Sequence, residues 1–156
     1  MIKVGDSIPA ANITVISKEG QDSVSADSFF AGKKVVLFAL PGAFTPTCSE
    51  AHLPGYVVKY DDIIAKGVDA VACLSVNDAF VMKAWQGAQN AENLVMIADG
   101  GAALTKALDL VLETADFGGT RSQRYSMIVD NGVVTHLNVE TDGFEVSDAD
   151  TALSQL

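Results

Sequence analysis

The sequence has few cysteines, few basic residues and no long apolar run, and each shortage excludes a class of protein. Its 156 residues include only 2 cysteines, too few for a disulfide scaffold. The 20 acidic against 10 basic residues give a formal net charge of −10, which disfavours nucleic acid and anionic membrane surfaces as partners. The first apolar stretch is interrupted by Gly5, Asp6 and Pro9, so we expect no secretory signal and no membrane span. These shortages together predict a soluble, cytoplasmic protein.

The two cysteines, Cys48 and Cys73, are the residues with the most chemical potential in the chain. Cytosolic disulfides are usually transient and catalytic, so a structural disulfide is the weaker interpretation. Together with His52 and His136, the cysteines lack the paired short spacings of structural zinc sites. We therefore expect no bound metal.

Hydrophobic patterning predicts a single α/β domain over residues 1–156. A hydrophobic content of 49% in a chain of this length suffices for one good core. Apolar runs predict strands, and the stretches between them predict helices. The strands are expected at 35–40, 68–76 and 94–98, and the helices at 48–65 and 79–88. This alternation is typical of βαβ units in a mixed, mostly parallel sheet flanked by helices.

The sequence patterns near both ends of the chain predict β-hairpins and a short final helix. The β-branched run 13–16 and the turn residues 18–20 favour a hairpin at the sheet edge. After a helix at 102–110, the strands 125–129 and 133–137 flank Asn131-Gly132, a dipeptide suited to a type I′ turn. Ser147 is expected to cap a final helix that ends at Leu156. A terminal hairpin and helix after βαβ units match a thioredoxin-like layout.

Cys48 lies where the chain leaves the predicted strand 35–40 and begins a helix. Unpaired N–H groups at a helix N-terminus, helped by a nearby cation, favour the nucleophilic thiolate form of a cysteine. Pro54-Gly55 predicts a kink early in this helix and a first turn that can unwind. A free cysteine is more often a small buried hydrophobe, so the position alone leaves both interpretations open.

The residues around Cys48 form a recognisable pattern. Pro41, Thr45 and Cys48 stand at the spacing P-x-x-x-T-x-x-C, within PGAFTPTCS followed by HLPG. This stretch resembles the active-site signature of the peroxiredoxin family, in its type II or peroxiredoxin-5-like branch. Segments 75–82 and 124–127 also resemble that branch, so the resemblance covers nearly the whole chain. It implies a thioredoxin fold and a cofactor-free, thiol-dependent peroxidase that forms a homodimer.

The resemblance also implies roles for four residues. Cys48 would be the peroxidatic cysteine, Thr45 its hydroxyl partner, Pro41 a shield and Arg124 the guanidinium contributor. A threonine hydroxyl can bind a peroxide oxygen, and a guanidinium keeps its charge at all relevant pH values. Arg121 is three residues before Arg124, and the spacing alone does not say which of them points inward. The resemblance favours Arg124.

Other candidates carry two interpretations each. His52, one helical turn after Cys48, contacts the site or is a hydrogen-bonded structural histidine. Phe44, Phe80 and Phe117 rim the substrate pocket or pack a dimer face, although core burial is the commoner fate of phenylalanine.

Cys73 lies inside an apolar strand and is expected to be inert by burial. Some members of the resembled branch use a resolving cysteine at this strand position, and others use one in a late loop. The late loop 142–147 has no cysteine here. A Cys48–Cys73 disulfide would need Cα atoms within roughly 7 Å and an unwound first turn. An external thiol, such as glutathione or glutaredoxin, with thioredoxin as the other candidate, is therefore the favoured reductant.

The predicted reaction is attack of the Cys48 thiolate on hydrogen peroxide or an organic hydroperoxide. It releases water or an alcohol and leaves a sulfenic acid that a thiol reduces, so no cofactor is expected. A thiol–disulfide oxidoreductase is less favoured, because Thr45 and Ala51 stand where a C-x-x-C pair would need a second cysteine. A non-catalytic thioredoxin-like binding module remains the alternative from another class.

Overall fold

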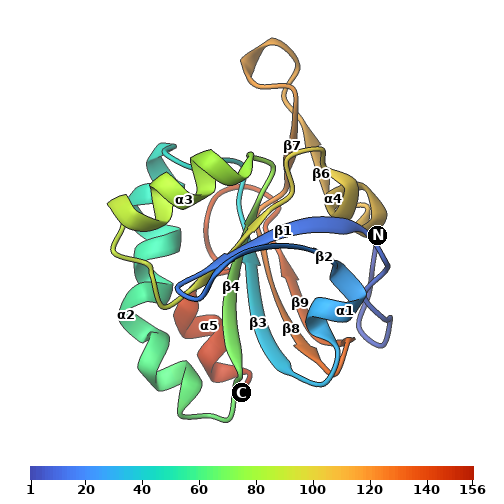
Figure 1. Cartoon of the computed structure of the whole chain (residues 1–156), viewed down its shortest axis with the longest axis vertical. Helices are drawn as coiled ribbons and strands as arrows, with labels where there is room; N and C mark the ends of the chain where they lie inside the picture. The colour runs from blue at the N-terminus through green and yellow to red at the C-terminus, as the bar shows by residue number, and fades with distance from the viewer.

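A seven-stranded mixed sheet forms the centre of the molecule (Figure 1). The computed structural model describes residues 1–156. The strands of this sheet are β1 (Asn12–Ser17), β2 (Gly20–Ser25), β3 (Lys34–Ala39), β4 (Ala70–Ser75), β5 (Val95–Ala98), β8 (Tyr125–Asp130) and β9 (Val133–Val139). In space they run in the order β2-β1-β5-β4-β3-β8-β9, so the apolar strands β3 and β4 lie near the middle.

The strand directions of this sheet differ in part from those predicted from the sequence. Only β3 with β4 and β4 with β5 pair in parallel, while the remaining four pairings are antiparallel. The mixed, helix-flanked sheet is confirmed, but the expectation of a mostly parallel one is wrong. The reason is physical: an apolar run reports burial on both faces of a strand and does not report the direction of its neighbours.

Helices cover both faces of the sheet and bury a hydrophobic core on each. They are α1 (Ala26–Phe30), α2 (Leu53–Ile64), α3 (Ala79–Ala88), α4 (Ala103–Leu108) and α5 (Ala149–Ser154). Figure 1 shows α2, α3 and α5 on one side of the sheet, with α1 and α4 on the other. The core on the first side includes Tyr56 and Trp85, and the core on the second includes Phe30 and Leu104. No helix has the length and apolar character that crossing a membrane requires.

Both predicted hairpins are present. The β1-β2 hairpin lies at the sheet edge, and β8-β9 turns at Asn131 (φ 49°) and Gly132 (φ 79°), the two positive φ angles that a type I′ turn needs. The cap of the final helix is corrected: Asp148, not Ser147, accepts a hydrogen bond from the Thr151 N–H. The Ser147 hydroxyl instead donates to Glu140 at 2.7 Å.

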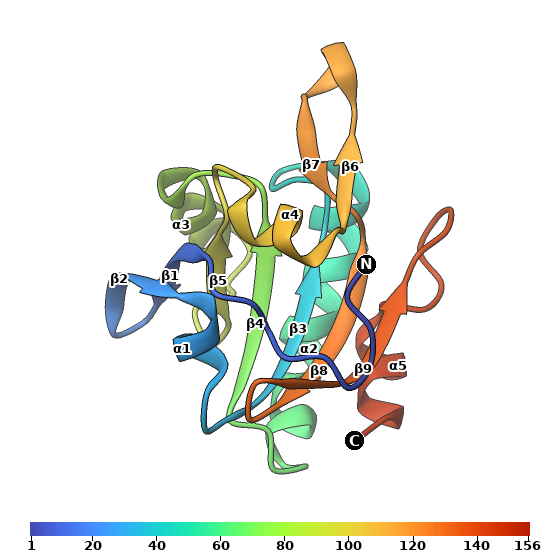
Figure 2. The same cartoon turned by 90° about the vertical axis from the view of Figure 1, so that its right-hand side faces the viewer.

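A second, two-stranded sheet was not predicted from the sequence. Strands β6 (Val111–Glu113) and β7 (Thr120–Ser122), joined through the short 3₁₀ helix η2 (Ala115–Phe117), form an arm that projects from the body (Figure 2). Three residues per strand are too few to give a readable alternation of polar and apolar positions. The predicted helix at 102–110 ends earlier than expected, at Leu108, and the arm begins three residues later.

Candidate active site

Cys48 opens an irregular helical turn beyond the carboxyl end of β3. Residues 48–52 form a π-helical turn, η1 (Cys48–His52), in which the Leu53 N–H bonds the Cys48 carbonyl, and α2 continues from Leu53. Pro54 lies in the first turn of α2, where it has no N–H to give to Glu50 and its ring would crowd that carbonyl. The irregularity predicted from Pro54 is therefore present, in the form of a wider turn that carries Cys48.

The Cys48 thiol is buried, with 1% of the residue exposed, yet it contacts a permanent cation. The Arg124 Nη2 donates to Cys48 Sγ at 3.3 Å. Sheet topology explains this contact, because antiparallel pairing of Ala39 with Tyr125 puts the start of β8 beside the end of β3. Arg124 directly precedes β8, so it arrives next to the loop that Cys48 follows.

His52 holds the other side of the Arg124 guanidinium. Its Nδ1 lies 2.9 Å from Arg124 Nη1, and its Nε2 lies 3.0 Å from the Ser147 carbonyl oxygen. Since a guanidinium only donates and a carbonyl only accepts, the proton of the neutral ring is on Nε2 and Nδ1 accepts. Burial, reinforced by the positive charge of Arg124, lowers the pKa of His52 to about 3. His52 is thus a neutral acceptor that orients Arg124.

Phe144 covers this group from the loop after β9. Its ring lies 4.9 Å from the ring of His52 and 5.9 Å from the Arg124 guanidinium carbon. On the inner side, Phe38 and Tyr56 stack at 3.9 Å, and the Tyr56 hydroxyl donates to the Ser147 carbonyl oxygen at 2.8 Å. Burial raises the pKa of Tyr56, so this hydroxyl keeps its proton. Sequence reasoning missed Phe144, because the late loop has no pattern that marks its direction.

Thr45 and Pro41 lie in the segment before Cys48. The Thr45 hydroxyl donates to the Gly42 carbonyl oxygen at 2.6 Å, which uses its proton and leaves its lone pairs free to accept one from a ligand. The Pro41 carbonyl oxygen accepts from Arg121 Nη1 at 3.0 Å. Arg121 also donates through Nε to the Gly118 carbonyl at 3.1 Å, so it ties the β6-β7 arm to this segment and makes no hydrogen bond to Cys48.

A cavity of about 450 Å³ opens beside this group. Pro41, Thr47, Arg124 and Phe144 are among its lining residues, and Leu112 of the arm closes one side. The cavity is large enough for a small ligand to reach Arg124. Neither Phe44 nor Phe117 lines it. They are exposed instead, at 57% and 84%, as is Phe80 at 87%.

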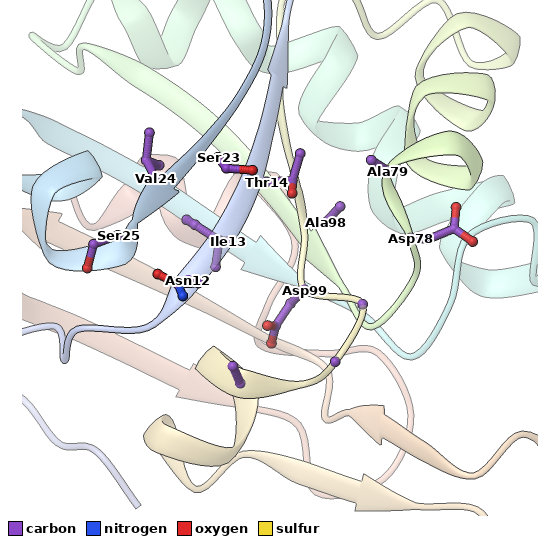
Figure 3. Close-up of a pocket in the computed structure, with 13 residues that line it drawn as sticks. Asn12, Ile13, Thr14, Ser23, Val24, Ser25, Asp78, Ala79, Ala98 and Asp99 are labelled. Atoms are coloured by element: carbon purple, nitrogen blue, oxygen red, sulfur yellow. The ribbon is translucent and has the colours of Figure 1, made fainter.

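A larger cavity, of about 620 Å³, lies between the β1-β2 hairpin and residues 98–103 (Figure 3). Its two acidic side chains are already engaged by the backbone. Asp99 accepts from the Leu104 and Thr105 N–H groups, and Asp78 caps α3 by accepting from the Val81 N–H. Arg124, His52, Phe144 and Cys48 are all absent from its lining, so this cavity is separate from the group around Cys48.

Cys73 lies in the middle of β4, fully buried and opposite Phe38 of β3. Burial, together with the nearby Cys48, raises the pKa of the Cys73 thiol, which favours its neutral form. Both cysteines are free. The structure therefore brings Cys48, Arg124 and His52 together and keeps Cys73 in the apolar interior.

Comparisons with known proteins agree with this architecture. The sequence model of the redoxin family matches residues 3–153. Peroxiredoxin-2D of Arabidopsis thaliana is 45% identical over 159 residues, covering 99% of this chain and 98% of that protein. The crystal structure of reduced Prx3 from Vibrio vulnificus in complex with hydrogen peroxide matches with a TM-score of 0.96 at 62% identity, over 99% of both chains. Peroxiredoxin 5 from Alvinella pompejana matches with a TM-score of 0.86 at 32% identity, over 99% of this chain and 97% of that chain.

The chain belongs to the redoxin family and, within it, to the peroxiredoxins of the type II, peroxiredoxin-5-like, branch. The thioredoxin-like fold expected from the sequence is confirmed. These relatives also show the activity of the chain, which is a thiol-dependent peroxidase.

Proposed function

We propose that Cys48 is the peroxidatic cysteine and that it reduces hydrogen peroxide and organic hydroperoxides through a sulfenic acid. The observation that carries this proposal is the 3.3 Å hydrogen bond from Arg124 to Cys48 Sγ. A permanent guanidinium at this distance favours the thiolate, which is the nucleophilic form of a cysteine. Cys73 has no such partner, and burial raises the pKa of its thiol.

In the first step, the Cys48 sulfur attacks the terminal peroxide oxygen and forms an S–O bond while the O–O bond breaks. The sulfur is oxidised to sulfenic acid, and the other oxygen takes up a proton and leaves as water or an alcohol. Arg124 stabilises the negative charge that develops on the leaving oxygen. The free lone pairs of Thr45 accept a hydrogen bond from the peroxide, and Pro41 shields the thiol from bulk water.

The second half of the proposal is that an external thiol resolves the sulfenic acid. A first thiol forms a mixed disulfide with Cys48 and releases water, and a second thiol then frees Cys48 as a disulfide of the reductant leaves. Burial of Cys73 within β4 supports this cycle over an internal disulfide. Glutathione, glutaredoxin and thioredoxin are the candidate reductants, and we place the cycle in the cytoplasm, where such thiols keep cysteines reduced.

A homodimer is the proposed assembly. Two aromatic side chains are exposed: Phe80, in α3, at 87%, and Phe44, in the segment before Cys48, at 57%. The ring of Phe44 lies 6.4 Å from the ring of Trp85, which also belongs to α3. Aromatic side chains are enriched at protein interfaces, so these two exposed rings are candidates for one. Phe44→Ser with Phe80→Ser should shift a dimer to monomer in sedimentation, and a monomeric wild type would contradict the proposal.

The proposed chemistry is tested by measuring the intact mass of the protein after treatment with one equivalent of hydroperoxide, with and without a reagent that traps sulfenic acid. We expect one added oxygen, or one trap adduct, mapped to the peptide that contains Cys48. Cys48→Ser should show neither. An adduct on Cys73, or none at all while peroxide is consumed, would contradict the assignment.

A further inference from the structure

Glu140, directly after β9, organises the loop that covers the active site. Its carboxylate accepts hydrogen bonds from the N–H groups of Glu145, Val146 and Ser147 at 2.8 to 3.0 Å. It also accepts from the Ser147 hydroxyl at 2.7 Å. Partial burial alone would raise the pKa of Glu140, but these hydrogen bonds outweigh it and lower the pKa. The ionised carboxylate is therefore the form that holds the loop.

The loop that Glu140 holds supports the active-site histidine. The Ser147 carbonyl oxygen accepts from His52 Nε2 at 3.0 Å and from the Tyr56 hydroxyl at 2.8 Å. With its proton fixed on Nε2, the His52 ring presents Nδ1 to Arg124 Nη1 at 2.9 Å. Arg124 then reaches Cys48 through its other terminal nitrogen. A continuous set of hydrogen bonds thus runs from Glu140 to the thiol.

A backbone hydrogen bond also links Glu140 directly to Arg124. The Glu140 N–H donates to the Arg124 carbonyl oxygen at 2.9 Å, so the acid and the arginine are neighbours across the ends of β8 and β9. Phe144, in the loop between Glu140 and Ser147, lies over both His52 and Arg124. Glu140 and Phe144 also line the cavity at Arg124, so the position of this loop sets one wall of that cavity.

We propose that Glu140 is a positioning residue for peroxide reduction: its carboxylate fixes the loop 141–147, and through Ser147 and His52 it aims Arg124 at Cys48. This inference rests on the proposed role of Cys48. It assigns a function in the reaction to an acid that does not touch the thiol.

The hydrogen bonds that the Glu140 carboxylate accepts suggest a substitution that disturbs them alone. A carboxylate offers lone pairs on two oxygens, which serve the N–H and O–H donors around Glu140. Glu140→Gln keeps the size but removes the negative charge to which these donors point. Its NH₂ group would face the Glu145 N–H if it took the place of Oε1, or the Val146 and Ser147 donors if it took the place of Oε2. Glu145→Gln is the matched control, because Glu145 is exposed in the same loop and loses the same charge.

The experiment measures peroxide reduction by rapid mixing, together with the protonation of the His52 ring by NMR. We expect Glu140→Gln to lower the second-order rate constant for hydrogen peroxide by about tenfold or more, since small misplacements of reacting groups cost up to about 10²-fold. The Nε2 proton signal of His52 should weaken or shift in Glu140→Gln. Glu145→Gln should match wild type in both.

A double variant tests whether Glu140 acts through His52. In a His52→Phe background, Glu140→Gln should change the rate less than about twofold, since residues on one path are not additive. Equal rates and equal His52 signals in wild type and Glu140→Gln would overturn the proposal, as would additive losses in the double variant. If Glu140→Gln does not fold, Glu140→Asp replaces it. Its side chain is one methylene shorter and withdraws the carboxylate from the loop donors, so wild-type rates and wild-type His52 signals in that variant overturn the proposal. A wild type that reduces no peroxide would instead refute the role of Cys48.

Discussion

The two cysteines of this chain are equally hidden from solvent and differ in everything else that governs reactivity. Cys48 lies in a π-helical turn beyond the end of β3, within hydrogen-bond distance of a guanidinium. Cys73 sits in the regular middle of β4, where burial raises the pKa of its thiol. Exposure of a cysteine in one static conformation therefore does not predict its function. A nearby fixed charge does so better.

The first prediction replaces the sulfur of Cys48. Cys48→Ser should lose peroxide turnover by on the order of 10³-fold or more, because a serine oxygen cannot take up the transferred oxygen atom. Circular dichroism should show an intact fold. Turnover near the wild-type level in a folded Cys48→Ser protein would mean that the wrong cysteine had been assigned.

The second prediction removes the charge that distinguishes the two sites. Arg124→Ala should slow peroxide reduction by about 10²-fold, the usual loss for one donor to a developing negative charge. The ultraviolet absorbance of the thiolate at neutral pH should fall as well. Arg121→Ala is the control, because Arg121 bonds the Pro41 and Gly118 carbonyls and should leave the thiolate signal unchanged. Identical signals in all three proteins would refute the role of Arg124.

The third prediction concerns the pH dependence of folding stability that His52, beside Cys48, should cause. The pKa of His52 is about 3 in the folded chain and 6.5 without the fold, so only the unfolded chain takes up this proton between these values. Stability is therefore fully present above pH 6.5 and falls as the pH drops. The loss between pH 6.5 and 5 should be on the order of 1 to 2 kcal/mol.

Urea unfolding at a series of pH values measures this loss. His52→Gln keeps a donor for Ser147 and an acceptor for Arg124 but does not titrate, so its stability should change less over the same range. The two proteins share every other ionisable group, so the difference between their curves isolates His52. A wild-type curve as flat as that of His52→Gln would show that His52 is not held neutral.

The smallest expected effect is that of Cys73. Cys73→Ala, chosen because a buried serine hydroxyl would add an unpaired polar group, should keep turnover with an external thiol within about twofold. Peptide mapping of oxidised wild type without reductant should find Cys48 as sulfenate or mixed disulfide. The irregular turn argues the other way, since a turn that opens could carry Cys48 to Cys73. A major Cys48–Cys73 disulfide, with lost turnover in Cys73→Ala, would establish an internal cycle.

Sequence reasoning succeeded where one local property decides a structural element. Helix α3 has the predicted bounds, because Asp78 caps a stretch of mostly apolar, helix-forming residues. The Asn131-Gly132 turn needed two positive φ angles, and few other dipeptides accept them. Pro54 marked the irregular turn through its missing N–H. In contrast, the Ser147 cap was wrong because Glu140, from another element, had already engaged that hydroxyl.

Local sequence patterns were enough to predict most strands and helices of the main sheet and the irregular turn at Cys48, but not α1 or the β6-β7 arm. The spacing of Pro41, Thr45 and Cys48 also indicated the family. Only the tertiary structure decided which arginine meets the thiol, because antiparallel pairing of β3 with β8 carries Arg124 to Cys48 while Arg121 turns toward the arm. It also decided the neutral state of His52 and the support of its ring by Glu140. Side-chain direction and charge environment come from long-range packing, which local sequence patterns do not encode.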